Sequence, residues 1–225
     1  MDTSELDTFA DDPLVQAVTA YVKDYMANYD ASHDWSHILR VVGLARHIYA
    51  KSENRDELDL RVIQLAALLH DVGDRKYANP SSTSSSPTPI SSLLLLHGAP
   101  PTLATQIQTI CLAVSYSTEV KNPAHTLSVL ATHPELAVVQ DADRLDAVGA
   151  IGLGRMFTFG GAKTGRPMDE SMEHVEEKLL RLEGMAKTRV GRELMRERTE
   201  RLRVFRGWWK EERGFAAGAG AGGGL

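Results

Sequence analysis

Residues 60–71 read LRVIQLAALLHD, and this stretch decides the fold. Apolar side chains occur on nearly every face of a helix drawn through it, so we expect the segment to lie at the centre of a helical core. It ends on two polar residues, His70 and Asp71, which are about 100° apart around a helix and can flank one point. Burying both is costly unless they are paired, and a divalent cation would pair with both. A helix end bonded to a carbonyl is the alternative.

Polar residues also gather in helical surroundings elsewhere in the chain. In the first such cluster, His33 and His37 are four residues apart and share one face of a helix if the helix starts before His33. In the second, Asp143 is one of three acids within six residues that have apolar neighbours, which is hard to explain as a solvated face. Together these clusters favour one functional site over several separate structural roles. The clusters are HDWSH (33–37), VQDADRLD (139–146) and SMEHVEEKL (171–179).

The remainder of the chain also shows helical spacing of apolar residues, and we find neither an alternating strand pattern nor an internal repeat. The sequence therefore predicts an all-α protein. The expected helices cover residues 14–26, 35–52, 60–71, 101–115, 126–143 with a break at Pro134, 144–157, and 169–213 with a break near 188–191.

Three segments have compositions that oppose a packed core. Residues 1–11 form an acidic lead-in, and residues 215–225 (FAAGAGAGGGL) form a Gly/Ala tail, so we expect both to be disordered. The interior stretch NPSSTSSSPTPISS (79–92) predicts a surface loop. A single domain over residues 12–214 remains.

Composition limits the possible partners and the compartment. The 225 residues carry a net charge of −5, so no general basic field favours nucleic acid or an anionic membrane. The single cysteine, Cys111, cannot build a disulfide framework or a zinc-finger cluster. The apolar runs are too short to span a membrane, and the acidic start is unlike a signal peptide. We therefore expect a cytoplasmic protein that binds neither nucleic acid nor membrane.

Four longer stretches resemble the HD-domain superfamily of metal-dependent phosphohydrolases, and in particular its small stand-alone hydrolases, some of which are nucleotide pyrophosphohydrolases. The resemblance extends over roughly residues 14–213 and implies a single HD-domain helical bundle. The stretches are HDWSHILRVVGLA (33–45), LAALLHDVGDRKY (65–77), VQDADRLDAVGAIGLGRMFTFGG (139–161) and HVEEKLLRLEGMAKT (174–188).

The resemblance also implies a ligand set for one divalent metal ion. The matching ligands are His37, His70, Asp71 and Asp143, whereas Asp141 and Asp146 match flanking acids. Two imidazoles and two carboxylates suit Mn²⁺, Mg²⁺, Fe or Co²⁺, with Zn²⁺ and Ni²⁺ as competitors.

The neighbouring motif residues supply the other expected roles. By analogy, Asp74 orients or deprotonates the attacking water, although it could instead pair with Arg75 or Lys76. A phosphorylated substrate also needs cations, since the net charge supplies no general field. The expected substrate-binding residues are Arg40, Lys76, Arg144, Lys178 and His33, each of which could instead lie on the surface or in an ion pair.

The function that follows is hydrolysis of a small phosphorylated substrate, with a nucleoside triphosphate giving monophosphate and pyrophosphate as the preferred reaction. The alternatives are a dinuclear-iron oxygenase of the same fold, a phosphodiesterase or phosphomonoesterase, and a binding protein with a vestigial site. Dinuclear relatives add two histidines between His70 and Asp143, where this chain offers His97, His125 and His133 but has Ser115 in one of the matching places. One metal is therefore favoured. A monomer or a homodimer is expected.

Overall fold

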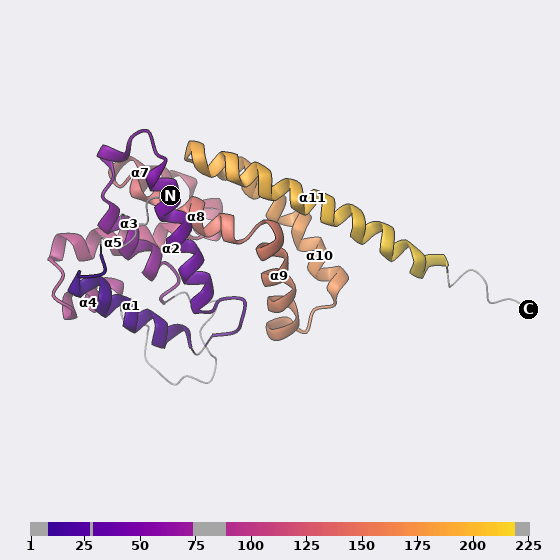
Figure 1. Ribbon diagram of the computed structural model, residues 1–225, viewed down its shortest axis with the longest axis horizontal. Helices are drawn as coiled ribbons and strands as arrows, with labels where there is room; N and C mark the ends of the chain where they lie inside the picture. The colour runs from indigo at the N-terminus through magenta and orange to yellow at the C-terminus, as the bar shows by residue number, and fades with distance from the viewer. Residues whose placement is uncertain (1–8, 28, 74–88, 219–225) are drawn as a thin grey trace, which may run out of the picture.

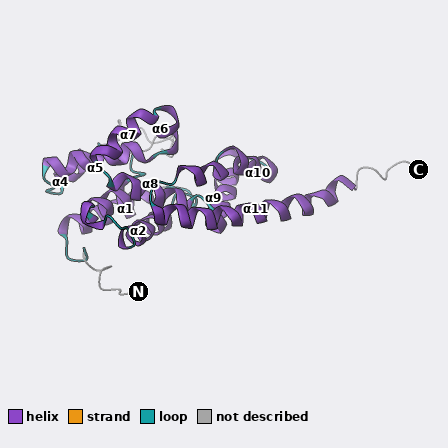
Figure 2. Ribbon diagram, turned by 90° about the horizontal axis from the view of Figure 1, so that it is seen from above, coloured by secondary structure: helices purple, strands orange, loops and turns teal. Residues whose placement is uncertain are grey.

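The computed structural model describes residues 9–27, 29–73 and 89–218, and these residues form helices and connecting turns without a strand (Figures 1 and 2). The predicted all-α class is confirmed. Within those ranges, no helix combines the length and the apolar character that crossing a bilayer requires. The α-helices are α1 (Pro13–Met26), α2 (Trp35–Ala50), α3 (Leu60–Leu69), α4 (Ile90–Leu96), α5 (Pro101–Val114), α6 (Tyr116–Lys121), α7 (Pro123–Thr132), α8 (Glu135–Asp146), α9 (Gly149–Phe159), α10 (Met168–Glu177) and α11 (Arg189–Gly218). Three short helical turns complete them: η2 (Arg55–Glu57), η3 (Gly160–Thr164) and η4 (Leu179–Met185).

Helix α3 lies at the centre of the core, as its sequence predicts. It packs against α1, α2, α5 and α8, and every residue from Val62 to Leu69 is buried. Its start is set by Asp59, whose carboxylate accepts hydrogen bonds from the backbone N–H groups of Arg61 and Val62 at 2.8 and 3.2 Å. Its end carries His70 to the point where α2 and α8 also meet.

The C-terminal helices form a second group beside this core. Helix α11 contacts α8, α9 and η4, and α10 contacts α9 and η4. In both ribbon views the C-terminal part of α11 extends beyond the other helices (Figures 1 and 2).

Two predicted segment boundaries are wrong. Residues 90–92 belong to α4 instead of the expected loop, because Ile90 is buried and Ser91 donates two hydrogen bonds to Gln108 Oε1. Residues 215–218 continue α11 instead of starting the tail. The rest of the expected loop, residues 79–88, lies outside the described residues, as do 1–8 and 219–225.

The helix predicted over 144–157 is also divided differently. Helix α8 continues to Asp146, and α9 begins only at Gly149, whose φ of +72° is a conformation that favours glycine. This turn redirects the chain after the acids of α8, so α9 can pass alongside the site.

Candidate metal centre

Three helices bring the four predicted ligands to one place. His37 stands in the first turn of α2, where the Asp34 side chain caps the helix by accepting from His37 N. His70 and Asp71 follow α3 directly, and Asp143 belongs to α8. The positions follow from the local sequence, because each ligand lies on or directly after a helix that packs a buried apolar face into the core.

The ligand atoms lie within coordinating distance of a shared point. The Nε2 atoms of His37 and His70 are 3.2 Å apart. Asp71 Oδ2 is 3.3 Å from His37 Nε2, and Asp143 Oδ1 is 3.7 Å from His70 Nε2. His37, His70 and Asp143 thus form a cluster compatible with a metal ion, and Asp71 adjoins it.

Hydrogen bonds on the far side of each imidazole support this use. His70 Nδ1 lies 2.8 Å from the Ala67 carbonyl, which only accepts, so Nδ1 carries the proton of the neutral ring. His37 Nδ1 makes a 2.8 Å contact with the Asp146 carboxylate, which acts the same way. In the neutral rings both Nε2 lone pairs therefore face the shared point, the arrangement typical of metal-binding histidines. Asp71 Oδ2 is buried without a hydrogen-bond partner, and a cation at that point would satisfy it.

The ionised histidine and carboxylate side chains of the centre stabilise one another. Burial opposes a charged imidazole, but Asp71 and Asp143 raise the pKa of His70 to about 9. Burial likewise opposes ionisation of Asp71, but His70 and His37 hold the pKa of its carboxyl well below its usual range. Without a metal ion a proton on His70 compensates the carboxylates, so metal binding should release protons.

Asp146 supports the centre by contacting the nitrogen of His37 that faces away from the ligand cluster. It is 1% exposed, and burial opposes its ionisation, but the bonds from His37 and Arg40 lower the pKa of its carboxyl. Arg40 donates through Nε at 2.7 Å and through Nη2 at 3.0 Å, and Arg155 approaches within 3.2 Å. Arg40, predicted to bind substrate, instead supports the carboxylate that orients His37.

The two other charged residues of the DADRLD motif, Asp141 and Arg144, have separate structural roles. Asp141 holds the residues that precede α11, accepting from the backbone N–H groups of Lys187 and Thr188, and Thr188 Oγ1 in turn accepts from Gly191 N in the first turn of α11. Arg144, predicted to bind substrate, is 2% exposed and pairs with Glu119 at 2.6 Å. Its guanidinium is directed to Glu119 and the Met185 carbonyl, so Arg144 forms an ion pair rather than a phosphate contact.

A cavity of about 490 Å³ opens directly beside the ligands, and His70, Asp71 and Asp143 form part of its wall. Two predicted substrate-binding residues also line it. His33 is close to His37, and burial together with nearby Arg155 lowers its pKa to about 4, so its ring is neutral at pH 7. Lys178 lies with Nζ 5.3 Å from the centre of the Tyr116 ring.

Further cavity residues were not predicted from the sequence. Arg155 on α9 and Arg166 after η3 add positive charge to the wall, and His174 comes from α10. Arg155 is fixed by a 2.7 Å bond from Nε to the Ser32 carbonyl. His174 belongs to the SMEHVEEKL cluster and Arg155 to the family-like stretch 139–161, which were the available signals, whereas Arg166 lies outside the quoted stretches.

Some predicted residues do not join the centre. Asp74 and Lys76 lie outside the described residues. Within the described part of the chain, the potential metal-binding cluster contains none of His97, His125 and His133.

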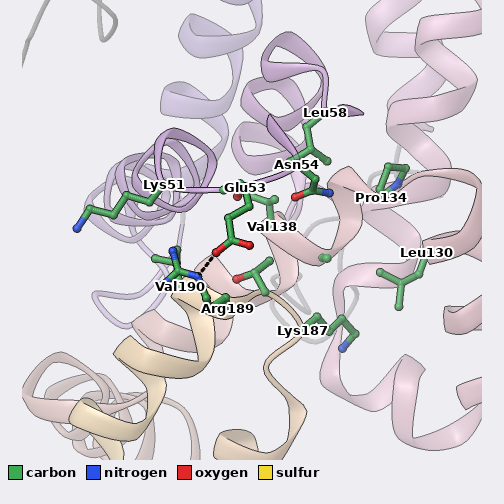
Figure 3. Close-up of a pocket in the computed structure, with 13 residues that line it drawn as sticks. Lys51, Glu53, Asn54, Leu58, Leu130, Pro134, Val138, Lys187, Arg189 and Val190 are labelled. Carbon is green, nitrogen blue, oxygen red and sulfur yellow. Dashed lines mark hydrogen bonds and ion pairs between the residues drawn. The ribbon is translucent and has the colours of Figure 1, made fainter. Parts of the chain in front are cut away.

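A separate cavity of about 290 Å³ lies between the end of α2, α8 and the start of α11 (Figure 3). Its acid, Glu53, pairs with Arg189 at 2.8 Å, as the dashed line in Figure 3 marks. No histidine is among the described residues that line it, so its chemistry differs from that of the metal centre.

Comparison with known proteins agrees with this geometry. The HD domain family model matches residues 34–148, which include all four predicted ligands. The uncharacterized protein YpgQ of Bacillus subtilis is 35% identical over 186 residues, covering 81% of this chain and 85% of the relative.

Solved structures give the same result. The crystal structure of B. subtilis YpgQ in complex with ADP superposes with a TM-score of 0.67 at 30% identity, covering 88% of this chain and 94% of that one. An HD-superfamily hydrolase from Bacillus thuringiensis gives a TM-score of 0.53 at 26% identity, covering 89% and 96%. The chain belongs to the HD domain family and has the fold of the HD-superfamily hydrolases.

Proposed function

We propose that this protein is a metal-dependent phosphohydrolase that acts on nucleotides. The observation that carries the proposal is that the imidazole lone pairs and the carboxylates converge in the wall of a cavity that also presents Arg155, Arg166 and Lys178. Such a cavity can hold a phosphate group beside a metal ion without a general basic surface.

The ligand set suits one divalent ion held by His37, His70, Asp71 and Asp143, with Mn²⁺, Mg²⁺, Fe or Co²⁺ as the expected metals. A bound ion of this kind lowers the pKa of water and neutralises negative charge that develops on phosphorus. Asp74 remains the predicted group that orients or deprotonates the water, and its position lies outside the described residues.

The other cavity residues would select and position the substrate. Arg166 and Lys178 offer donors for phosphate oxygens, and Arg155 is held rigidly by Ser32 and Asp146. Tyr116, Met156 and Phe159 give the cavity an apolar wall that fits a base or sugar. The ADP complex of YpgQ supports a nucleotide ligand for this chain.

The preferred reaction cleaves a nucleoside triphosphate between the α- and β-phosphorus atoms. The water oxygen bonds to the α-phosphorus, the bond from that phosphorus to the bridging oxygen breaks, and monophosphate, pyrophosphate and a proton are released. Cleavage of a phosphodiester or a phosphomonoester is the alternative within the same chemistry. A dinuclear-iron oxygenase is disfavoured because the described cluster offers ligands for one ion.

The test combines metal analysis with a substrate screen. Metal content per chain is measured for the wild type, His70→Ala, Asp143→Ala and the exposed-histidine control His125→Ala. Nucleoside tri-, di- and monophosphates and a phosphodiester are then incubated with Mn²⁺, Mg²⁺ or Co²⁺ in H₂¹⁸O. We expect one metal per chain and ¹⁸O in the nucleoside monophosphate, with both lost in the two site variants and kept in the control.

Other outcomes separate the alternatives. Label in released inorganic phosphate would identify phosphomonoester or terminal-phosphate cleavage. Two irons per chain with oxygen consumption and no hydrolysis would overturn the proposal in favour of the oxygenase.

A further inference from the structure

A third cavity, of about 400 Å³, lies behind the metal centre between α2, α11 and the first turn of α9. Asp146 contributes to its wall, but it shares no lining residue with the cavity that holds the predicted metal ligands. Its charged and titratable residues are Arg40, His47, Asp146 and Arg198. The proposed substrate site does not use this space.

Arg198 is the unusual member of this group. Exposed arginines of the same helix, such as Arg201 and Arg203, pair with glutamates, as the ion pairs Arg201–Glu197 and Arg203–Glu183 illustrate. Arg198 is half-buried and, among the described residues, forms no ion pair; its one hydrogen bond runs from Nη1 to the Leu145 carbonyl at 2.6 Å. Burial lowers the pKa of its guanidinium, so the cation is held in a place that disfavours it.

The acid that lines this cavity already has hydrogen-bond partners. Asp146 is the acid of the cavity wall, and it already accepts from His37, Arg40 and Arg155. Burial, with Lys51 and Arg198 next, lowers the pKa of His47, as expected in positive surroundings. Asp146 is thus the one carboxylate that lines the cavity beside Arg40 and Arg198, while Asp34 and Glu197 act on these two arginines from outside its lining.

The start of α9 adds to the same field. This 11-residue helix has no acidic residue in its first turn and no side chain capping its N-terminus. Its Ile151 lines the cavity, and Arg198 lies against Gly149, where an added Cβ would be 3.2 Å from Arg198 Cβ. An uncapped helix N-terminus carries partial positive charge and binds anions.

We propose that this cavity is a second anion site that binds a phosphate-type oxyanion through Arg198, Arg40 and the first turn of α9. The guanidinium groups match the oxygens of such an anion. Leu44 and Leu194 complete the wall with apolar surface, which leaves the charged residues to hold the ligand. The anion shares Arg40 with Asp146, so its site adjoins the support of His37.

The test is isothermal titration of the full-length, metal-loaded protein with inorganic phosphate. We expect two binding events in the wild type. In Arg198→Gln one event becomes about tenfold weaker and the other is unchanged. Arg201→Gln, on the exposed face of the same helix, serves as the matched control and should keep both events. Lys178→Gln should weaken only the event at the substrate cavity.

A second variant guards against an effect on folding. Ile151→Glu places a carboxylate at the cavity wall on a side chain that is 46% exposed, and it should weaken the same event as Arg198→Gln. Parallel titrations with pyrophosphate and a nucleoside monophosphate distinguish a free phosphate from the phosphate group of a nucleotide. A wild-type protein with no event that Arg198→Gln weakens, whether it shows one event or two, overturns the proposal, whereas a single event that Arg198→Gln weakens and Lys178→Gln leaves unchanged supports it. Because binding is read directly, a failure of the hydrolysis screen leaves this result independent.

Discussion

Asp146 Oδ2 lies 2.8 Å from His37 Nδ1, although 109 residues separate the two in the sequence. This contact fixes which nitrogen of His37 carries the proton, and hence that its Nε2 faces the ligand cluster. Arg40 and Arg155 in turn hold the carboxylate. The candidate metal centre therefore depends on a residue that touches neither the metal position nor the substrate cavity.

The first prediction concerns this support. Asp146→Asn keeps the size of the side chain but removes its negative charge, so His37 loses the partner that selects its tautomer. We expect metal affinity to fall about 10- to 100-fold. A metal-binding isotherm measures this, and the exposed variant Asp56→Asn is the control. Equal metal affinity in both variants would contradict the role assigned to Asp146.

The second prediction concerns substrate binding. Lys178→Gln and Arg166→Gln each remove a cation from the cavity wall without altering a predicted metal ligand. We expect KM for the nucleotide to rise about tenfold in each, with unchanged metal content. Steady-state kinetics measure KM, and Lys210→Gln on the exposed surface of α11 serves as the control. A loss of metal in either variant would show that its effect is not confined to substrate binding.

The cluster of His37, His70 and Asp143 could be predicted from the sequence because its signal is local. An apolar helix ending on His70 and Asp71 can be read from one stretch, and the all-α pattern repeats along the chain. The residues that support the ligands were harder to predict from the sequence. Asp146 was recognised as a flanking acid, but its bond to His37 depends on how α2 packs against α8. The sequence of either helix alone does not show which residues of the other helix it will contact.

Arg144 and Arg155 illustrate the same limit from both sides. Arg144 is next to Asp143 in sequence, which suggested a place in the site, but the turn of α8 directs it to Glu119. Arg155 is not next to a predicted metal ligand in the sequence, and the turn at Gly149 brings it to the cavity. Adjacency to a ligand in the sequence therefore did not place Arg144 in the site, whereas a change of chain direction brought the distant Arg155 to it.

The third prediction follows from the position of Arg144. Glu119→Gln removes the charge that pairs with Arg144 at 2.6 Å and with Lys187 at 3.0 Å, so two cations lose their partner in a largely buried place. We expect the free energy of unfolding to fall by about 3 kcal/mol, with KM for the nucleotide unchanged. Urea unfolding and kinetics measure the two effects, with exposed Glu173→Gln as the control. A raised KM without loss of stability would restore Arg144 as a substrate-binding residue.

The fourth prediction concerns acid stability. Asp12 accepts from Arg61 Nε at 2.6 Å and caps α1, and chiefly the bond from Arg61 lowers the pKa of its carboxyl. A lowered folded-state pKa stabilises the protein above the unfolded-state value of about 3.9, and this contribution is lost as the pH falls through the folded-state value. Asp12→Asn should therefore cost about 1 kcal/mol at pH 7 and progressively less below about pH 4.

Denaturant unfolding at several pH values between 7 and 3 checks this prediction. The difference in free energy of unfolding between the wild type and Asp12→Asn should be constant in the upper part of the pH range and shrink in the lower part. Asp56→Asn should show no such trend. A difference in free energy of unfolding that grows as the pH falls would contradict a stabilising role of the ionised Asp12 carboxylate.

The fifth prediction compares two glycines of α11. A Cβ on buried Gly191 would overlap the Asp141 carboxylate and lie 2.7 Å from Thr188 Oγ1, whereas a Cβ on exposed Gly207 meets nothing within 4 Å. Gly191→Ala should lower the free energy of unfolding by about 1–3 kcal/mol, since Asp141 must move away from its bonds to Lys187 and Thr188. Gly207→Ala should raise it by about 1 kcal/mol, because alanine is the better helix former.

The same pair of variants connects the start of α11 to the metal centre. Asp141 and Asp143 are two residues apart on α8, so displacing the first disturbs the backbone that presents the second. We therefore expect weaker metal binding in Gly191→Ala and unchanged binding in Gly207→Ala, measured by the same isotherm as for Asp146→Asn. If Gly191→Ala is destabilised but binds metal as tightly as the wild type, the contacts of Asp141 at the start of α11 do not affect the position of Asp143. Weakened binding in Gly207→Ala would instead point to a general effect of changes in this helix.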